Sequence, residues 1–186
     1  MTLGSHQKTV GKSQIHITPR WILDRLGPFG LDPCAAVVRP WDCAAINWTV
    51  LDDGLSRRWP RALRVWVNAP FDRYQVARWI QRLADHGRGT ALLHVRSETN
   101  WFEVCWQHAS GMLFLDKRIK FCRPDGSEHP HNSGAPVMLV AFGDKDLAQL
   151  RDAGIAGWLV TDWRHIGAQR KSAAATGDLF ARIQAP

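Results

Sequence analysis

Continuous apolar segments that alternate with amphipathic ones constrain the fold of this chain more than any other feature. The segments 64–67 (RVWV), 90–95 (TALLHV), 111–115 (GMLFL) and 137–142 (VMLVAF) are apolar at almost every position, which is typical of strands buried on both faces. Apolar residues at helical spacing predict helices over 72–87, 100–109 and 144–154. In the first of these, Asp72 is the expected cap, Gly87 the expected stop, and the inward residues are Val76, Trp79, Ile80 and Leu83. The alternation predicts an α/β fold with a mostly parallel sheet that helices cover on both faces.

Shorter elements are predicted before and after these segments. In ITPRWILDRLG, Thr18 is a candidate N-cap, Pro19 suits the first helical position and Gly27 can end the helix. Two further strands are expected to end at Asp32-Pro33 and at Asp52-Asp53-Gly54. The segment 116–126 (DKRIKFCRPDG) resembles a hairpin, so we expect the sheet to carry an antiparallel edge hairpin.

The length and composition of the chain predict one domain with two tails. The 186 residues are enough for one buried core, which we place at 16–163. Residues 1–15 are polar, basic and aperiodic, so we expect a flexible basic arm there. Residues 164–186 are rich in Arg, Lys and Ala and are expected to form a C-terminal tail.

The basic balance favours a polyanionic partner such as nucleic acid. Lys and Arg number 24 against 17 for Asp and Glu, a formal charge of +7. The basic residues gather in two groups, which could form a phosphate-binding rim: Arg57, Arg58, Arg61 and Arg64, and Lys117, Arg118, Lys120 and Arg123. The alternative is that the charge only keeps the protein in solution.

The cysteines and the hydropathy predict neither a metal site nor a membrane span. Cys34, Cys43, Cys105 and Cys122 include no C-x-x-C pair, and no signal peptide precedes them. His129-Pro130-His131 has no third ligand nearby in the sequence, so we expect no metal there. The longest apolar runs are shorter than the roughly 20 residues that span a bilayer. We therefore expect a cytoplasmic protein.

Distinctive polar residues follow three of the expected strands. These are Asp32-Pro33, Asp52-Asp53-Gly54 and Asn68-Ala69-Pro70-Phe71. In an open α/β sheet, ligands bind outside the carboxyl ends of the strands, so the three segments are expected to converge on one crevice. Each aspartate segment could instead be a simple turn. The sequence has neither G-x-G-x-x-G nor G-x-x-x-x-G-K-[ST], which disfavours dinucleotides and ATP.

Asn68-Ala69-Pro70-Phe71 resembles the [Asp/Asn/Ser]-Pro-Pro-[Tyr/Phe/Trp] motif of amino-group methyltransferases that use S-adenosylmethionine. A longer ordered series is similar to the small phage and prophage Dam-type DNA N6-adenine methyltransferases, over roughly residues 16–143. The series is TPRWILDRL, FGLDPCA, DDGLSRRW, VNAPFDR, LLHVRSETNWF, LDKRIKF and SGAPVMLVAF. This resemblance implies a Rossmann-like methyltransferase sheet, S-adenosylmethionine as cofactor, DNA as partner and, for a phage protein, the cytoplasm of a bacterial host.

The resemblance also implies roles for individual residues. Asn68 and the Ala69 carbonyl would accept hydrogen bonds from the adenine amino group, next to Pro70, and Phe71 would stack on a flipped base. Cofactor contacts would come from one N-terminal pair and from residues after the first two strands: Thr18, Pro19, Asp32, Pro33 and Asp53. Asp52 is an equally good candidate by residue type.

Family members generally have Pro at the position of Ala69, which leaves alternatives open. Ala69 keeps the carbonyl but lacks the fixed φ of proline, so catalysis could be slower. A weak or inactive methyltransferase-fold DNA-binding protein and a cytosine-N4 methyltransferase are the alternative functions. Target recognition is expected from the N-terminal arm and residues 116–134, and the sequence leaves open the target sequence, the oligomeric state and whether Ser97, Glu98 and Thr99 serve the site or cap a helix.

Overall fold

The computed structural model describes residues 16–70 and 73–165, and within them the chain forms one mixed sheet with four α-helices and a 3₁₀ helix. The elements up to residue 86 are α1 (Arg20–Leu26), β1 (Leu31–Asp32), β2 (Ile46–Asn47), β3 (Val65–Val67) and α2 (Arg73–His86). The later elements are β4 (Gly89–His94), η1 (Asn100–Phe102), α3 (Glu103–His108), β5 (Gly111–Leu115), β6 (Val137–Phe142), α4 (Asp144–Asp152) and β7 (Gly157–Val160).

The strands of the described residues follow the order β2-β1-β3-β4-β6-β5-β7. β1 is parallel to β2 and β3, and β3 is parallel to β4. β6 is antiparallel to its neighbours β4 and β5, and β7 is antiparallel to β5. Because β4 and β5 both oppose β6, they run in the same direction. The carboxyl ends of β1 to β5 therefore meet at one edge of the sheet, called the carboxyl edge below, and the amino edge lies opposite.

The expected mostly parallel sheet with an antiparallel edge hairpin is wrong. Three pairings of the described strands are parallel and three are antiparallel. β6 lies inside the sheet between β4 and β5 and is buried along its whole length. The partly exposed β7 forms an edge. A continuous apolar run indicates burial on both faces, but it does not reveal the direction of the neighbouring strands.

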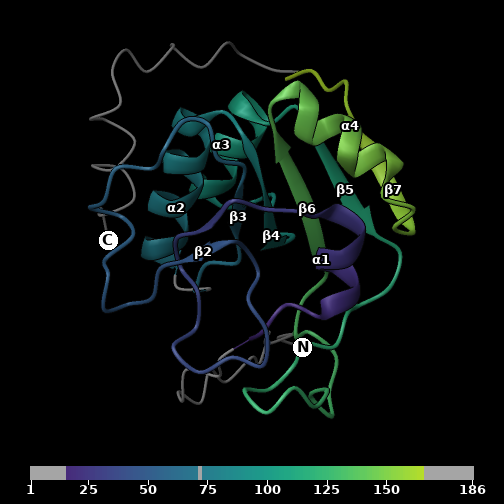
Figure 1. Cartoon of the computed structure of the whole chain (residues 1–186). Helices are drawn as coiled ribbons and strands as arrows, with labels where there is room; N and C mark the ends of the chain where they lie inside the picture. Colours follow the sequence, from purple (N-terminus) through teal and green to yellow (C-terminus); the bar gives the residue numbers. More distant parts are fainter. Residues whose placement is uncertain (1–15, 71–72, 166–186) are drawn as a thin grey trace, which may run out of the picture.

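Helices cover both faces of the sheet, as the sequence predicts (Figure 1). Side chains alternate along β6, so that Met138, Val140 and Phe142 join one core cluster and Val137, Leu139 and Ala141 join the other. The first cluster is completed by α2, η1 and α3, and the second by α1 and α4. The predicted inward residues of α2 are all buried: Val76, Trp79, Ile80 and Leu83.

α1 and α2 end at the glycines that the sequence predicts, whereas α1 begins one residue later than predicted. Gly27 follows α1, and Gly87 follows α2 with φ 71°, the left-handed conformation that glycine adopts readily. α1 begins at Arg20 with Pro19 as N-cap, so the assignment of Thr18 as N-cap and Pro19 as first helical residue is wrong by one position. Asp72, the expected cap of α2, lies outside the described residues.

Arg64 does not belong to a phosphate-binding rim, contrary to the sequence-based expectation. It is buried at the amino edge, where its Nε lies 2.5 Å from Oδ1 of the equally buried Asp146 on α4. Its guanidinium also donates to the Leu26 carbonyl and lies 4.1 Å from the centre of the Phe29 ring. Arg64 therefore joins β3, α1 and α4 as a structural residue.

The connection from β5 to β6, residues 116–136, extends from the carboxyl edge and appears in green at the bottom of Figure 1. In place of the expected hairpin of named strands, Cys122 forms isolated antiparallel bridges with Ile17 and Glu128. The backbone N–H of Cys122 donates to the Ile17 carbonyl at 2.9 Å, and that of His129 donates to the Phe121 carbonyl at 2.8 Å. The first bond attaches the connection to the segment that precedes α1, and the second lies within the connection itself.

Candidate active site at the carboxyl edge

The candidate site lies where the strand order changes direction. The chain passes from β1 to β2 on one side and places β3 on the other side of β1. Such a switch point is where open α/β sheets bind their ligands. Asp32 ends β1 and Asn68 directly follows β3, so both predicted residues lie at this position.

Asn68 is half-buried, and hydrogen bonds hold its amide group. Nδ2 donates to the His16 carbonyl at 2.8 Å and to the Thr18 hydroxyl at 3.1 Å. A carbonyl oxygen only accepts hydrogen bonds, so the atom facing His16 must be the amide nitrogen. This contact orients the amide and turns Oδ1 away from His16.

The Oδ1 atom of Asn68 is buried and has no hydrogen-bond partner in the described part of the chain. An unpaired buried acceptor costs about 1–3 kcal/mol, so native structures contain few of them. The amide nitrogen is thus hydrogen-bonded, whereas the amide oxygen has no hydrogen-bond partner among the described residues. The arrangement can accept a hydrogen bond from a donor that the described protein atoms do not supply.

Asp32 organises the turn that follows β1. Its Oδ1 accepts the Cys34 backbone N–H at 3.0 Å, and its carboxylate also receives hydrogen bonds from the Cys34 and Cys43 thiols. Burial raises the pKa of Asp32 to about 6, and these hydrogen bonds together with the charge of Arg39 limit the rise. Cys34 in turn accepts a hydrogen bond from the Asn68 backbone N–H, so the turn contacts the segment that follows β3.

The turn at Asp52-Asp53-Gly54 packs against Pro33. A Cβ atom on Gly54 would lie 2.0 Å from the Pro33 carbonyl oxygen, so only glycine permits this approach. The Asp52 carboxylate is engaged by the Thr49 backbone N–H at 2.9 Å and by Arg57 at 3.0 Å. Asp53 is exposed, and its carboxylate has no ion-pair partner among the described residues. Asp53 is therefore the more available of the two carboxylates.

Thr18 and Pro19 are buried next to Asn68, at the start of α1. Thr18 uses its hydroxyl to hold the Asn68 amide, and its carbonyl accepts the Trp41 indole N–H at 3.2 Å. Ala69 is buried and Pro70 is exposed, whereas Phe71 lies outside the described residues. The structure thus brings Asp32 and Asn68 together with the N-terminal pair, and the turn at Gly54 packs on Pro33. The expectation that a strand ends at Asp52-Asp53-Gly54 is wrong, because β2 ends at Asn47 and these residues form a later turn.

Two residues next to Asn68 were not predicted from the sequence. His16 contributes a backbone carbonyl, which any residue type could supply, so its identity carried no signal. Cys34 follows the Asp32-Pro33 pair, and only the packing of β1 beside β3 shows that its thiol meets Asn68. Neither contact could be inferred from local patterns.

Two histidines at the carboxyl edge are held neutral. Burial, followed by electrostatic repulsion from Arg96 and from His16 when it is protonated, lowers the pKa of His94 to about 4. Burial and His129 lower the pKa of His16. At neutral pH these two imidazoles therefore add no positive charge.

The remaining expectations concern Thr99, metals and membranes. Thr99 is the backbone N-cap of η1, yet its hydroxyl donates to the Arg96 carbonyl at 2.7 Å instead of capping the helix. Within residues 16–70 and 73–165, no group of three or more His, Cys, Asp or Glu side chains is arranged to hold a metal ion. No helix of that part of the chain has the length and apolar character needed to cross a bilayer.

Hollows of about 530 Å³ and 360 Å³ lie elsewhere on the described chain, and Asn68 lines neither of them. The larger one is formed by α1 and the β5–β6 connection, with Trp21 and Lys117 among its lining residues. What marks Asn68 as a candidate site is therefore the convergence of polar groups on it and its unpaired acceptor.

Comparison with known proteins assigns the chain to a family. It is 30% identical over 84 residues to the DNA N-6-adenine-methyltransferase of Haemophilus phage HP1 (strain HP1c1), a match that covers 43% of this chain and 49% of that protein. The chain thus matches about half the length of this curated relative, and no solved structure matches it. The sequence model of the DNA N-6-adenine-methyltransferase (Dam) family matches residues 6–153. The chain therefore belongs to the DNA N-6-adenine-methyltransferase (Dam) family.

Proposed function

We propose that this protein transfers a methyl group from S-adenosylmethionine to the N6 amino group of adenine in DNA, in the cytoplasm of a bacterial host. The observation that carries the proposal is the buried, unpaired Oδ1 of Asn68 on an amide that His16 and Thr18 hold in place. Family membership and the basic balance of the chain support the same reaction and the same polyanionic substrate.

The chemistry of an exocyclic amino group explains the need for such an acceptor. The lone pair of the adenine nitrogen is conjugated with the ring, which makes the amino group a poor nucleophile. Hydrogen bonds from its N–H groups to Asn68 Oδ1 and the Ala69 carbonyl localise that lone pair and aim it. Acceptors that are already fixed need no reorganisation during the reaction. A base inside the duplex cannot reach this pair, so we propose that it is flipped and stacked on Phe71.

The residues around Asn68 suit a cofactor that carries a sulfonium and ribose hydroxyls. When bound, S-adenosylmethionine supplies an electrophilic methyl group. We assign its binding to Thr18 and Pro19, to the turn that Asp32 and Pro33 form, and to the exposed carboxylate of Asp53. The neutral state of His16 and His94 suits a cationic cofactor because it avoids charge repulsion. The switch point between β1 and β3 is also compatible with a Rossmann-like methyltransferase sheet.

The proposal is tested by incubating the protein with labelled S-adenosylmethionine and unmethylated DNA, followed by nucleoside analysis. The expected product is N6-methyladenine. Exclusive formation of N4-methylcytosine would replace adenine as the target, because both bases present a conjugated amino group. Absence of either product, with folded protein that binds the cofactor, would contradict the proposed methylation activity.

A catalytically inactive DNA-binding protein is the second candidate, because Ala69 stands where the family generally has proline. Calorimetry with S-adenosylmethionine separates the two functions. An active enzyme binds the cofactor, whereas an inactive relative binds only DNA, with an affinity that falls as salt rises.

A further inference from the structure

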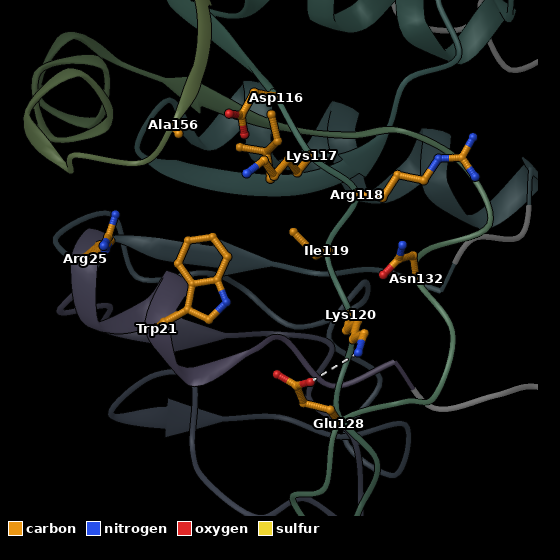
Figure 2. A pocket seen from close by; sticks show the side chains of 11 residues that line it. Trp21, Arg25, Asp116, Lys117, Arg118, Ile119, Lys120, Glu128, Asn132 and Ala156 are labelled. Carbon is orange, nitrogen blue, oxygen red and sulfur yellow. Dashed lines mark ion pairs between the residues drawn. The ribbon is translucent and has the colours of Figure 1, made fainter.

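The pocket of about 530 Å³ lies between α1 and the start of the β5–β6 connection (Figure 2), and Asn68 is not among its lining residues. Trp21 and Arg25 line it from α1, and residues 115–120 line it from the end of β5 and the connection. Because β5 ends at the carboxyl edge, this pocket and the candidate active site open at the same edge of the sheet.

The lining of this pocket carries an excess of positive charge. Four cationic side chains face two anionic ones, and the Glu128 carboxylate is 3.7 Å from Lys120. Arg25 donates to the Gly154 carbonyl. Lys117 and Arg118 are exposed, and neither has an ion-pair partner in the part of the chain that the structure describes. These two cations are available to an external anion.

Trp21 adds a flat apolar surface beside these cations. Its side chain is 44% exposed although it belongs to a helix whose Ile22, Leu23 and Leu26 are buried. In Figure 2 the indole projects into the pocket, with Lys117 above it and Arg118 extending outward from the connection. An exposed aromatic ring next to unpaired cations is the combination that proteins use to bind the base or sugar of a nucleotide together with its phosphate.

The backbone around the pocket is held in place without a ligand. Ser133 N–H donates to the Ile119 carbonyl at 2.7 Å, and the Ile17 and Cys122 backbones exchange two hydrogen bonds. The Phe121 ring lies 4.9 Å from the His16 ring, and His16 also accepts the Asn68 amide. Binding at a preorganised surface loses less conformational entropy than binding at a flexible loop.

The pocket is also close enough to Asn68 for one DNA strand to contact both. Thr18 touches the Asn68 amide, and Trp21 is three residues further along the chain. Chain geometry limits the separation of these two Cα atoms to about 11 Å. Successive phosphates of one strand are spaced by roughly 3.4 Å along the helix axis, so the pocket lies within a few nucleotides of a base at Asn68.

We infer that this pocket binds the DNA strand close to the target base, with one backbone phosphate at Lys117, another at Arg118, and the flat apolar face of a nucleotide against Trp21. The inference rests on the proposed function, because it takes DNA as the polyanionic substrate. It assigns part of DNA binding to α1 and the β5–β6 connection, independently of the amino-group acceptors.

The test measures the affinity of the full chain for a short fluorescein-labelled DNA duplex over a range of salt concentrations. Lys117→Ala and Arg118→Ala should each lower the slope of log affinity against log salt by about 0.9, because each removes one phosphate contact. Trp21→Ala should weaken binding by about five-fold or more, and Trp21→Phe should retain most of the affinity. Lys145→Ala is the matched control, since this exposed lysine starts α4 near the amino edge and does not line the pocket.

Wild-type affinity and salt slope in the Trp21, Lys117 and Arg118 variants would overturn the inference, as would an equal effect of Lys145→Ala. An unchanged urea unfolding midpoint verifies that each variant is folded, and Trp21→Phe with Lys117→Ala decides the question if Trp21→Ala does not fold. The readout needs no methyl transfer, so it tests the pocket even if no N6-methyladenine forms. If the wild-type chain methylates DNA but the pocket variants bind DNA normally, the proposed function stands. In that case this pocket takes no part in DNA binding.

Discussion

Buried polar groups lie at both edges of the sheet, and the two groups differ in how completely the protein satisfies them. At the amino edge, the Arg64 guanidinium uses Asp146, backbone carbonyls and the Phe29 ring as partners. At the carboxyl edge, the Asn68 amide is bonded through its nitrogen, while its buried oxygen has no partner among the described residues.

The difference separates a structural cluster from a candidate functional one. Partners for Arg64 come from α1, β4 and α4, so the cluster ties distant elements together. The carboxyl edge instead joins the ends of β1 and β3, strands of two and three residues, and leaves the buried Asn68 Oδ1 without a partner among the described residues. A native fold tolerates an unsatisfied atom of this kind where a partner can complete it. The four predictions below test this contrast.

The largest expected effect is a loss of stability at the amino edge. Asp146→Ala should lower the free energy of unfolding by about 3–5 kcal/mol, because it leaves the buried Arg64 charge without its carboxylate. Urea denaturation measures the loss, and Asp146→Asn, which keeps an acceptor, should lose less. Methylation per folded molecule should be unchanged. A loss of activity larger than the loss of folded protein would show that the two edges are not separate.

Asn68→Ala should produce the opposite result at the carboxyl edge. Methylation should fall by about 10²–10³-fold, the effect of removing one preorganised hydrogen-bonding group from a reacting centre. Thr18→Val keeps Oδ1 and removes only the 3.1 Å contact that orients the amide, so it should reduce the rate less. Rates of methyl transfer and urea unfolding are measured for both variants. Equal activity of Asn68→Ala and the wild type would exclude the acceptor role.

Two titratable groups near the carboxyl edge, the buried Asp32 and the half-buried His94, should make opposite contributions to the pH dependence of stability. Asp32 has a pKa of about 6 in the folded protein against its ordinary value of 3.8, so between these values the folded state keeps a proton that the unfolded chain has lost. The contribution of Asp32 to the free energy of unfolding therefore falls as pH rises through this window. His94 has a pKa of about 4 against 6.5, so the unfolded chain takes up a proton first and stability falls as pH decreases through that window. The Asp32 contribution is roughly 3 kcal/mol, and the smaller contribution of the partly exposed His94 offsets part of it where the two windows overlap.

Single variants should separate the two opposing effects of pH on the free energy of unfolding. Asp32→Asn should lose stability on acidification more steeply than the wild type, and His94→Gln should gain stability over the range in which Asp32 becomes protonated. Urea unfolding measured at intervals between the two pKa values tests both. Parallel pH profiles of the wild type and both variants would contradict the assignment of this dependence to Asp32 and His94.

The smallest expected effect is that of Ala69→Pro. Proline fixes φ and reduces the freedom of the unfolded chain, which stabilises a compatible position by about 0.4–1 kcal/mol. Methylation should be maintained or raised, because the carbonyl at position 69 becomes more rigid. A clear loss of methylation with intact folding would show that the buried Ala69 site does not accept the ring.

Local patterns in the sequence were enough to predict most elements and the residues of the candidate site. β5 and β6 occupy the predicted ranges 111–115 and 137–142, and α2 ends before Gly87 as expected. These features depend on periodicity and turn chemistry within a few residues, so they can be inferred without knowledge of the neighbours. Asn68 and Asp32 were recognised in the same way, from the residues that follow apolar runs.

Only the tertiary structure decided which strands pair, in which direction, and which polar groups meet. The insertion of β6 between β4 and β5, the burial of Arg64 against Asp146 and the tethering of Asn68 by His16 join segments far apart in the sequence. The two hydrogen bonds span 82 and 52 residues, respectively. An apolar run shows that a strand is buried and an arginine shows that a charge is present, but long-range packing determines which partner each one finds.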